Sequence, residues 1–249
     1  MNLVVDIGNT LVKSGVMERG ECLAERSAEV LTSATLDELL AVGPVGAAIV
    51  SSTRGDASQV VAMLRARLGR VVEFTPATRV PLANDYLTPE TLGRDRLAAA
   101  VGAATLFSGC DVLVVDFGTA VTLDLVTADG TFRGGTISPG LRTRFRALHD
   151  YTAQLPMCDA AACGDREGLV GRTTREAIEL GVVNSLTFEI EGHIARMRGR
   201  FDDLCVIFTG GDAKFFAKRI KNTIFANRNL VFCGLDRILE FHASEEDLL

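Results

Sequence analysis

The segment Leu3-Val4-Val5-Asp6-Ile7-Gly8-Asn9-Thr10 recurs 110 positions later as Leu113-Val114-Val115-Asp116-Phe117-Gly118-Thr119-Ala120. In both copies an apolar run leads into Asp, one apolar residue and Gly. A second β-rich stretch follows each copy, at Leu11 to Val16 and at Val121 to Val126, and a third follows a turn at Gly20 or at Asp129-Gly130. Because this spacing is about half of the 249-residue chain, the repeat predicts two similar halves that each open with a β-meander.

Later in each half the apolar residues adopt a helical period. We expect amphipathic helices at Asp56 to Leu68 and at Arg94 to Phe107 in the first half. The elements expected in the second half are helices at Leu141 to His149, Arg172 to Arg198 and Gly211 to Ile220, and a buried strand at Leu204 to Thr209. Because no Pro- or Ser-rich linker is present, we expect a tight boundary near Ser108-Gly109-Cys110, with domains of residues 1–110 and 111–249.

Composition argues against several classes of protein. The formal net charge is −6 and no block of five or more Lys and Arg occurs, so nucleic-acid binding is not expected. The first residues lack the pattern of a signal peptide, and no uncharged run approaches the length of a membrane span. The six cysteines form no Cys-x-x-Cys pair and His149, His193 and His242 stand at no ligand spacing, which predicts reduced thiols, no metal role for the histidines, and a cytoplasmic protein without a membrane partner.

The repeated Asp-x-Gly segments can bind phosphate. Gly at the tip of a β-turn allows backbone N–H groups to approach an anion closely, and the Asp at the strand end can hold a hydrated Mg²⁺. A single copy is most often a simple hairpin. Two copies facing each other across a cleft are the arrangement with which actin-like ATPases and sugar kinases bind ATP. The duplication therefore predicts an α/β protein with the actin-like ATPase (ribonuclease H-like) fold, in which two mixed-sheet halves flank a nucleotide cleft.

A third Gly-rich element, Thr209-Gly210-Gly211-Asp212, lies between the expected strand at Leu204 to Thr209 and a helix. It can be an ordinary strand-to-helix turn. In the actin-like superfamily, however, such a junction lines the adenosine pocket, because the absent side chains leave room for base and ribose. The two phosphate hairpins upstream favour that second interpretation.

The ordered motifs resemble those of the type III pantothenate kinases over essentially the whole chain. The matching segments are Asp6-Ile7-Gly8-Asn9-Thr10 with Lys13, Tyr86, Gly93-Arg94-Asp95-Arg96, Asp116-Phe117-Gly118-Thr119-Ala120, Gly134-Gly135-Thr136-Ile137-Ser138-Pro139-Gly140, Leu155-Pro156, Thr174, Gly181, and Thr209-Gly210-Gly211-Asp212. The resemblance implies phosphorylation of pantothenate by ATP, the first step of coenzyme A synthesis. It assigns no role to the stretch from Cys158 to Arg166.

The catalytic residue that the resemblance implies is Asp95. The attacking group is a primary alcohol, which must lose its proton, and a carboxylate that accepts or orients it suits this loose transition state. Asp95 is expected in the first turn of a helix, where the macrodipole favours the ionised form. The alternative is a helix-start Asp that pairs with Arg94 or Arg96.

The resemblance implies further binding roles. The residues expected to bind ATP are Asp6, Ile7, Gly8, Asn9, Thr10, Leu11, Val12, Lys13, Thr119, Gly210 and Gly211. Asp6 would position Mg²⁺ on the phosphates, and Asp116 would ligate a monovalent cation, K⁺ or NH₄⁺. The residues expected to bind pantothenate are Tyr86, Gly93, Arg94, Asp95, Arg96 and Thr174. The helices after Gly168 would form a homodimer whose interface completes the pantothenate pocket.

Several alternatives remain open from the sequence. Tyr86 can equally be a half-buried surface aromatic residue, and Thr174 can be a helix cap. At the level of function, the alternatives are a phosphoanhydride hydrolase of the same superfamily, similar to exopolyphosphatase, and a non-catalytic regulatory relative.

Overall fold

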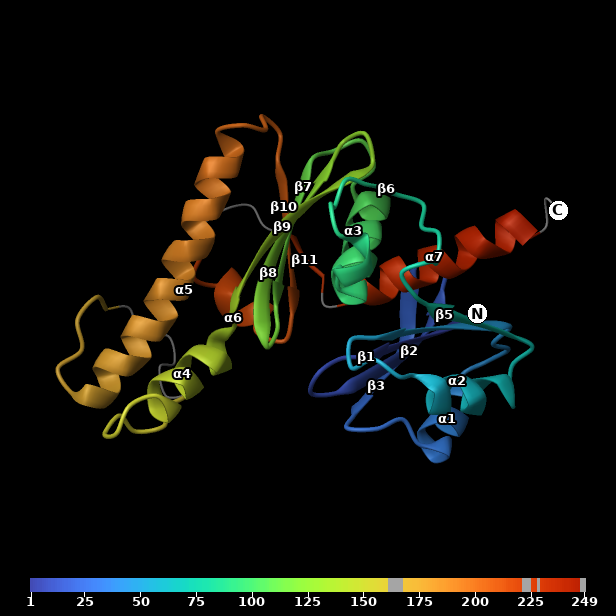
Figure 1. Cartoon of the computed structure of the whole chain (residues 1–249), viewed down its shortest axis with the longest axis horizontal. Coiled ribbons are helices and arrows are strands. Elements are labelled where there is room, and N and C mark those ends of the chain that lie inside the picture. The colour runs from blue at the N-terminus through green and yellow to red at the C-terminus, as the bar shows by residue number, and fades with distance from the viewer. Residues whose placement is uncertain (161–167, 221–224, 228, 247–249) are drawn as a thin grey trace. The chain divides into compact units, whose positions relative to one another are not determined.

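The computed structural model describes residues 1–160, 168–220, 225–227 and 229–246, which form two compact units (Figure 1). The first unit consists of Met1–Val112, Asp124–Gly134 and Asn229–Leu249, and the second of Leu113–Leu123 and Gly135–Arg228. The sequence analysis divided the chain once, at residue 110. In the structure the first unit also takes in a segment from the middle of the chain and its last helix.

The first unit contains a five-stranded mixed sheet in the order β3-β2-β1-β4-β5. Its strands are β1 (Asn2–Ile7), β2 (Val12–Glu18), β3 (Glu21–Ala28), β4 (Ala47–Ser52) and β5 (Arg70–Phe74). Strands β1, β2 and β3 form the expected antiparallel meander, and β4 and β5 continue the sheet in the direction parallel to β1. The carboxyl ends of β1 and β4 therefore lie at the same edge of the sheet.

Helices cover both faces of this sheet (Figure 1). Side chains alternate between faces along a strand, so Leu3 and Val5 of β1 pack with α1 (Ser33–Leu40) and α2 (Ser58–Arg65), whereas Val4 packs with α3 (Arg94–Leu106) and α7 (Leu230–Glu246). The helix expected at Asp56 to Leu68 is present but shorter, and α3 agrees with its expected bounds.

Helix α7 approaches α3 backbone to backbone. A Cβ atom on Gly234 would lie 1.7 Å from the carbonyl oxygen of Ala98, and one on Gly102 would lie 2.4 Å from that of Leu230. No larger residue fits at either position, so these two glycines fix the close packing of the last helix in the first unit. A short strand β6 (Ala83–Asn84) and a 3-10 turn (Pro89–Thr91) precede α3.

The second sheet has the order β11-β10-β7-β8-β9-β6. Its further strands are β7 (Val112–Phe117), β8 (Ala120–Thr127), β9 (Thr131–Pro139), β10 (Cys205–Gly210) and β11 (Phe225–Ala226). Read from β9, the order β9-β8-β7-β10-β11 reproduces β3-β2-β1-β4-β5 of the first sheet. The sequence repeat therefore marks a repeated topology, and the predicted pair of mixed sheets is confirmed.

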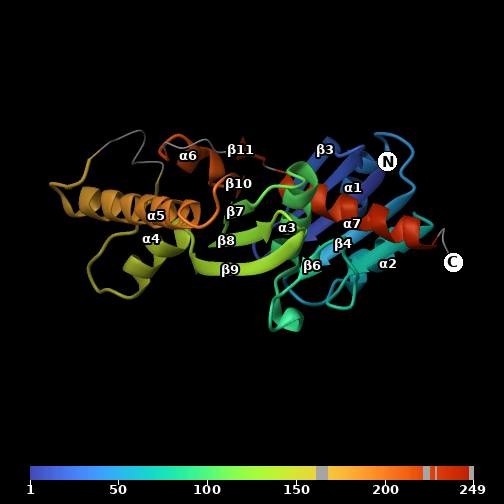
Figure 2. The same cartoon turned by 90° about the horizontal axis from the view of Figure 1, so that it is seen from above.

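The second unit adds α4 (Leu141–Asp150), α5 (Thr174–Arg198) and the short α6 (Ala213–Ala217). Helix α4 packs beside α5, as Figure 2 shows. The expected helices at 141–149 and 172–198 are confirmed, and the one expected at 211–220 is shorter. No helix in the described part of the chain is long and apolar enough to cross a membrane.

Candidate active site

The first Asp-x-Gly segment forms the hairpin between β1 and β2. Asp6 lies opposite Lys13 in the antiparallel register, and both residues are half-buried. The N–H of Gly8 donates to the carbonyl of Leu11 at 3.1 Å and closes the turn, which leaves Asn9 and Thr10 exposed. A carboxylate, an amine and an exposed turn therefore stand together at the edge of the first sheet.

The loop after β4 anchors this hairpin. Because β4 is parallel to β1 with Ser52 beside Ile7, the next residues reach the tip. The backbone N–H and the hydroxyl of Thr53 donate to the carbonyl of Ile7 at 2.9 and 3.2 Å. Arg54 donates from Nε to the carbonyl of Gly8 at 2.5 Å. Sequence analysis assigned no role to either residue.

The second Asp-x-Gly segment forms a tighter hairpin between β7 and β8. Here the N–H of Gly118 donates to the carbonyl of Ala120 at 3.0 Å, so the turn is one residue shorter than the first. The residues near the place of Lys13 in this hairpin are Thr122 and Leu123, which carry no charge. The second hairpin thus has the acid of the first but not its amine.

The Gly-Gly-x-Ile-x-Pro-Gly segment holds the tip of the second hairpin. The carbonyl of Thr119 accepts bonds from the N–H of Gly140 at 3.0 Å and the hydroxyl of Thr143 at 2.6 Å. A Cβ atom on Gly140 would lie 2.1 Å from the carbonyl oxygen of Gly118. Only glycine fits there, which gives a physical reason for the last residue of the motif.

An ion pair between α4 and α5 holds the Gly-Gly-x-Ile-x-Pro-Gly segment in place. Arg144 donates from Nη2 to Glu189 at 2.5 Å and from Nε to the carbonyl of Pro139 at 2.7 Å. The hydroxyl of Ser138 donates to the other oxygen of Glu189 at 2.6 Å. The position of the Thr119 tip is therefore coupled through the motif to helices α4 and α5.

The Gly-Gly element lies directly against the second hairpin. Gly210 has a φ of +91°, and a Cβ atom there would lie 2.3 Å from a carboxylate oxygen of Asp116. The N–H of Asp212 donates to the carbonyl of Phe117 at 3.3 Å. Burial raises the pKa of Asp212, and the nearby Arg142 opposes this shift. The structure thus brings Asp116, Thr119 and Gly210 together within the second unit.

Two of the predicted pantothenate residues meet around a buried ion pair in the first unit. Arg96 binds the carboxylate of Asp124, and its guanidinium carbon lies 5.6 Å from the ring centre of Tyr86. Burial lowers the pKa of Arg96, but the bonds to Asp124 outweigh this and the net shift is upward. Asp124 was missed by the sequence analysis, although a lone Asp inside the apolar strand β8 was a usable signal.

Asp95 and Arg94 point to different partners at the start of α3. The carboxylate of Asp95 accepts from the N–H of Arg96 at 2.9 Å, and a Cβ atom on Gly93 would lie 2.6 Å from it. Arg94 is buried, and its Nη2 donates to the carbonyls of Pro89 and Leu92 at 3.3 and 2.5 Å. Arg94 therefore braces the turn that leads to Gly93, while Asp95 stays half-buried at the helix start.

Thr174 begins α5 but does not cap it. The cap is Thr173, whose side chain accepts from the N–H of Glu176 at 3.2 Å. Thr174 lines an apolar groove of about 710 Å³ between α4 and α5, together with Leu148, Tyr151 and other residues of the two helices. The cap interpretation of Thr174 is therefore wrong, and the residue instead lines the groove.

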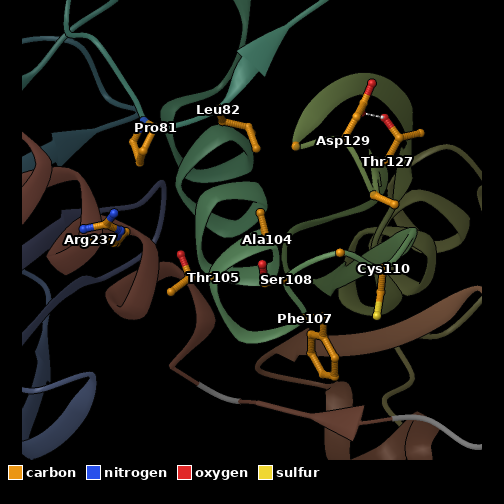
Figure 3. A pocket seen from close by; sticks show the side chains of 13 residues that line it. Pro81, Leu82, Ala104, Thr105, Phe107, Ser108, Cys110, Thr127, Asp129 and Arg237 are labelled. Carbon is orange, nitrogen blue, oxygen red and sulfur yellow. Dashed lines mark hydrogen bonds between the residues drawn. The ribbon is translucent and has the colours of Figure 1, made fainter.

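A separate cavity of about 430 Å³ lies within the first unit (Figure 3). It is lined by the end of α3, the turn between β8 and β9, and α7, including Thr105, Asp129 and Arg237. It contains none of the predicted site residues. The cavity is therefore distinct from both hairpins.

No metal-binding cluster of three or more His, Cys, Asp or Glu side chains occurs among the described residues. A magnesium ion bound chiefly through ATP phosphates, with one carboxylate such as Asp6, fits this donor set. The described cysteines Cys22, Cys110, Cys158, Cys205 and Cys233 are thiols that do not take part in disulfides. Of the unassigned stretch from Cys158 to Arg166, residues 161–166 lie outside the described part.

Comparison with known proteins gives a consistent result. A family model described as type III pantothenate kinase matches residues 2–196. A type III pantothenate kinase of Phocaeicola vulgatus is 38% identical over 242 residues, covering 97% of this chain and 99% of its own. One of Bacteroides fragilis is 40% identical over 247 residues, covering 97% and 98%.

Solved structures share the fold at low sequence identity. A Campylobacter jejuni protein described as a Baf family transcriptional activator has a TM-score of 0.63 at 20% identity, covering 97% of this chain and 99% of its own. The activator of the 2-hydroxyisocaproyl-CoA dehydratase from Clostridium difficile, with bound ADPNP, has a TM-score of 0.55 at 12% identity, covering 99% and 97%. These likenesses support the predicted actin-like ATPase fold and nothing further.

Proposed function

The chain belongs to the type III pantothenate kinase family, and we propose that it transfers the γ-phosphoryl group of ATP to pantothenate. The product is 4′-phosphopantothenate, and the reaction is the first step of coenzyme A synthesis. The observation that carries this proposal is a family match over residues 2–196, a range that includes both hairpins and the Gly93–Arg96 segment. A phosphoanhydride hydrolase would not need that segment, and the likeness to a transcriptional activator is one of fold alone.

The first hairpin supplies phosphate contacts in this proposal. The exposed residues Asn9 and Thr10 offer N–H and hydroxyl donors, and Lys13 beside Asp6 offers a cation. Mg²⁺, when bound with ATP, neutralises charge on the β- and γ-phosphates. Asp6 would hold that ion. In the second unit, Thr119 would contact phosphate and Gly210 with Gly211 would leave room for adenosine.

Pantothenate carries a carboxylate at one end and a primary hydroxyl group at the other. Arg96 would bind the carboxylate, because Asp124 fixes its Nε edge and leaves Nη1 outside the pair. Asp95 would orient the hydroxyl and accept its proton as the phosphoryl group arrives. Tyr86, Gly93 and Thr174 would complete the substrate contacts, and Arg94 would act indirectly by holding the turn before Gly93.

We base a monovalent cation at Asp116 on the motif resemblance, and the two hairpins also differ in the residue that lies across from the acid. In the first hairpin Lys13 lies opposite Asp6, whereas Thr122 and Leu123 in the second carry no charge. A carboxylate close to the polyphosphate repels it electrostatically. K⁺ or NH₄⁺ beside Asp116 would offset that charge.

We also propose that the protein is a cytoplasmic homodimer. The groove between α4 and α5 is lined mainly by apolar side chains, and Tyr151 at its edge is 89% exposed. Exposed apolar surface of this kind marks interaction sites, and Thr174 in the groove would link dimer formation to substrate binding. Light scattering that gives the mass of one chain at working concentration contradicts the dimer.

A coupled assay of ADP release tests the function directly. Purified protein with Mg²⁺ and ATP should release ADP in proportion to added pantothenate, and mass spectrometry should detect the phosphorylated product. ADP release that is equal with and without pantothenate contradicts the kinase and favours a hydrolase.

A further inference from the structure

We propose that Arg54 contacts the phosphates of the bound nucleotide. It would be a second cationic side chain of the first unit at this place, in addition to Lys13. Neither the motif resemblance nor the family comparison assigns this residue a role. The inference rests on the proposed function in one respect, namely that the first hairpin binds nucleotide phosphates.

The place of Arg54 follows from the parallel pairing of β1 and β4. Ile7 and Ser52 are neighbours in register, so Gly8 and Thr53 both leave the sheet at the same edge. Two bonds from Thr53 to the carbonyl of Ile7 and one from Arg54 to that of Gly8 tie the loop to the hairpin. The guanidinium group is thus attached at the turn whose N–H groups would bind phosphate.

The second unit contains an equivalent loop without this side chain. Strand β10 has the position in its sheet that β4 has in the first. The two residues after β4 are Thr53 and Arg54, and the two residues after β10 are Gly211 and Asp212. Strand β4 ends at Ser52 and β10 ends at Gly210, so Arg54 and Asp212 are each the second residue after their strand. In the second unit a backbone bond, from the N–H of Asp212 to the carbonyl of Phe117, joins this loop to its hairpin, so the repeated fold does not require an arginine here.

The chemistry of the free end of Arg54 fits phosphate. Its side chain donates one hydrogen bond, from Nε to Gly8, and within the described ranges neither terminal nitrogen has an acceptor. The residue is exposed, so those nitrogens add nothing to the core. A guanidinium group presents paired donors that match two phosphate oxygens, and an arginine at a transferring phosphoryl group stabilises the charge of the transition state.

The competing explanation is that Arg54 only ties down the carbonyl of Gly8. Replacement by glutamine separates the two roles, because the Nε2 atom of Gln is attached to Cδ just as Nε of Arg is. Arg54→Gln keeps a donor for Gly8 and removes both terminal nitrogens with the charge. Arg54→Lys keeps the charge and loses the paired donors. Arg65→Gln, at an exposed position of α2 in the same unit, is the matched control.

The test is to titrate the whole chain with each of three ligands at constant ionic strength and in the presence of Mg²⁺. The ligands are a non-hydrolysable ATP analogue, ADP and adenosine. We expect Arg54→Gln to raise the Kd of the triphosphate about tenfold or more, to leave the Kd of adenosine within twofold, and to retain the melting temperature. Arg54→Lys should fall between Arg54→Gln and wild type, and Arg65→Gln should match wild type.

Two outcomes overturn the inference. If Arg54→Gln binds the triphosphate with unchanged affinity, the only function of the Arg54 side chain is the hydrogen bond from Nε to the carbonyl of Gly8. If Arg54→Gln loses affinity for adenosine and for the triphosphate to the same extent, the substitution distorts the hairpin. Wild-type turnover with and without pantothenate is measured in parallel. A failure there contradicts the proposed function, whereas the titrations still decide the role of Arg54.

Discussion

Arg96 donates from Nε to both carboxylate oxygens of Asp124, at 3.1 Å each, and from Nη2 to one of them at 2.5 Å. The two side chains are 7% and 1% exposed. A guanidinium group that is buried and held along one edge can present its remaining edge in a single orientation. Asp124 therefore acts as a positioning residue for the arginine that we expect to bind the carboxylate of pantothenate.

The first prediction concerns the stability of this pair. Asp124→Ala should lower the free energy of unfolding by about 3–5 kcal/mol, because it leaves a buried cation unpaired. The exposed pair of Arg67 and Asp37 is the control, and Asp37→Ala should cost about 0–1 kcal/mol. Urea denaturation measures both values. Similar losses in the two variants would mean that burial of the Arg96 pair has no special effect.

The second prediction tests Asp95 as the catalytic carboxylate. Asp95→Asn keeps the shape of the side chain and its acceptor for the N–H of Arg96, but it cannot take a proton. We expect kcat to fall by about 10²- to 10⁴-fold while nucleotide affinity and melting temperature stay unchanged. Asp203→Asn in an exposed turn is the control. Near-normal turnover in Asp95→Asn would reduce Asp95 to a helix-start residue.

The third prediction compares two adjacent glycines. Gly210→Ala places a Cβ atom at positive φ and 2.3 Å from Asp116, whereas a Cβ atom on Gly211 meets nothing within 4 Å. A non-glycine residue in such a conformation costs on the order of 1–3 kcal/mol before any clash is counted. We expect a clear loss of stability in Gly210→Ala and none in Gly211→Ala.

The same two variants test the adenosine pocket. If Gly211 leaves room for the base or ribose, Gly211→Ala should raise the KM for ATP although the protein remains stable. A normal KM would remove Gly211 from the nucleotide site. Thermal unfolding and steady-state kinetics on the same preparations separate the two effects.

The sequence predicted the elements that leave a periodic or repeated signal. The recurrence of Asp6-Ile7-Gly8 as Asp116-Phe117-Gly118 located both meanders, and helical periods located α3 and α5. It did not predict where α7 packs, because that packing depends on Gly102 and Gly234 admitting a neighbouring backbone. Such contacts join distant residues and leave no pattern in the chain.

The missed site residues have the same explanation. Asp124 pairs with a residue 28 positions away, and Arg54 reaches a carbonyl 46 positions away. Arg54 taken alone is an ordinary polar residue in a loop, and Asp124 stands out only as a single acidic residue in an apolar strand. The partner of Arg54 follows from the pairing of β1 with β4, and that of Asp124 follows from the packing of α3 beside β8.

The fourth prediction concerns pH. Asp236 on α7 is 3% exposed and accepts a bond from Nδ2 of Asn2 at 2.8 Å. Burial raises its pKa, while the bonds from Asn2 and from the backbone N–H of Gly20 and the charge of the N-terminus oppose the shift. Burial, with the neighbouring Asp236 charge as a second cause, also raises the pKa of Glu240.

A raised pKa in the folded state means that the Asp236 carboxylate binds its proton more tightly in the folded protein than in the unfolded chain. Its stabilising contribution is present below the ordinary Asp pKa of about 3.9 and is lost as pH rises through the folded-state pKa. Asp236→Asn should remove this decline. We expect the difference in unfolding free energy between wild type and Asp236→Asn to change between about pH 3.9, the ordinary Asp pKa, and the folded-state pKa of Asp236. If the two plots of unfolding free energy against pH are parallel, the prediction is wrong.

The last prediction concerns the cation at Asp116. A Cβ atom on Gly210 would lie 2.3 Å from this carboxylate, which stands in the second hairpin, where we propose that Thr119 contacts phosphate. Exchange of Na⁺ for K⁺ or NH₄⁺ at constant ionic strength should raise the rate, because the loosely held ion offsets that charge where phosphate binds. Constant ionic strength is needed because screening alone alters anion binding.

Asp116→Asn should lose the difference in rate between the Na⁺ and K⁺ salts, whereas Asp203→Asn should keep it. Equal wild-type rates in Na⁺ and K⁺ would contradict the role of Asp116 and leave the kinase assignment intact.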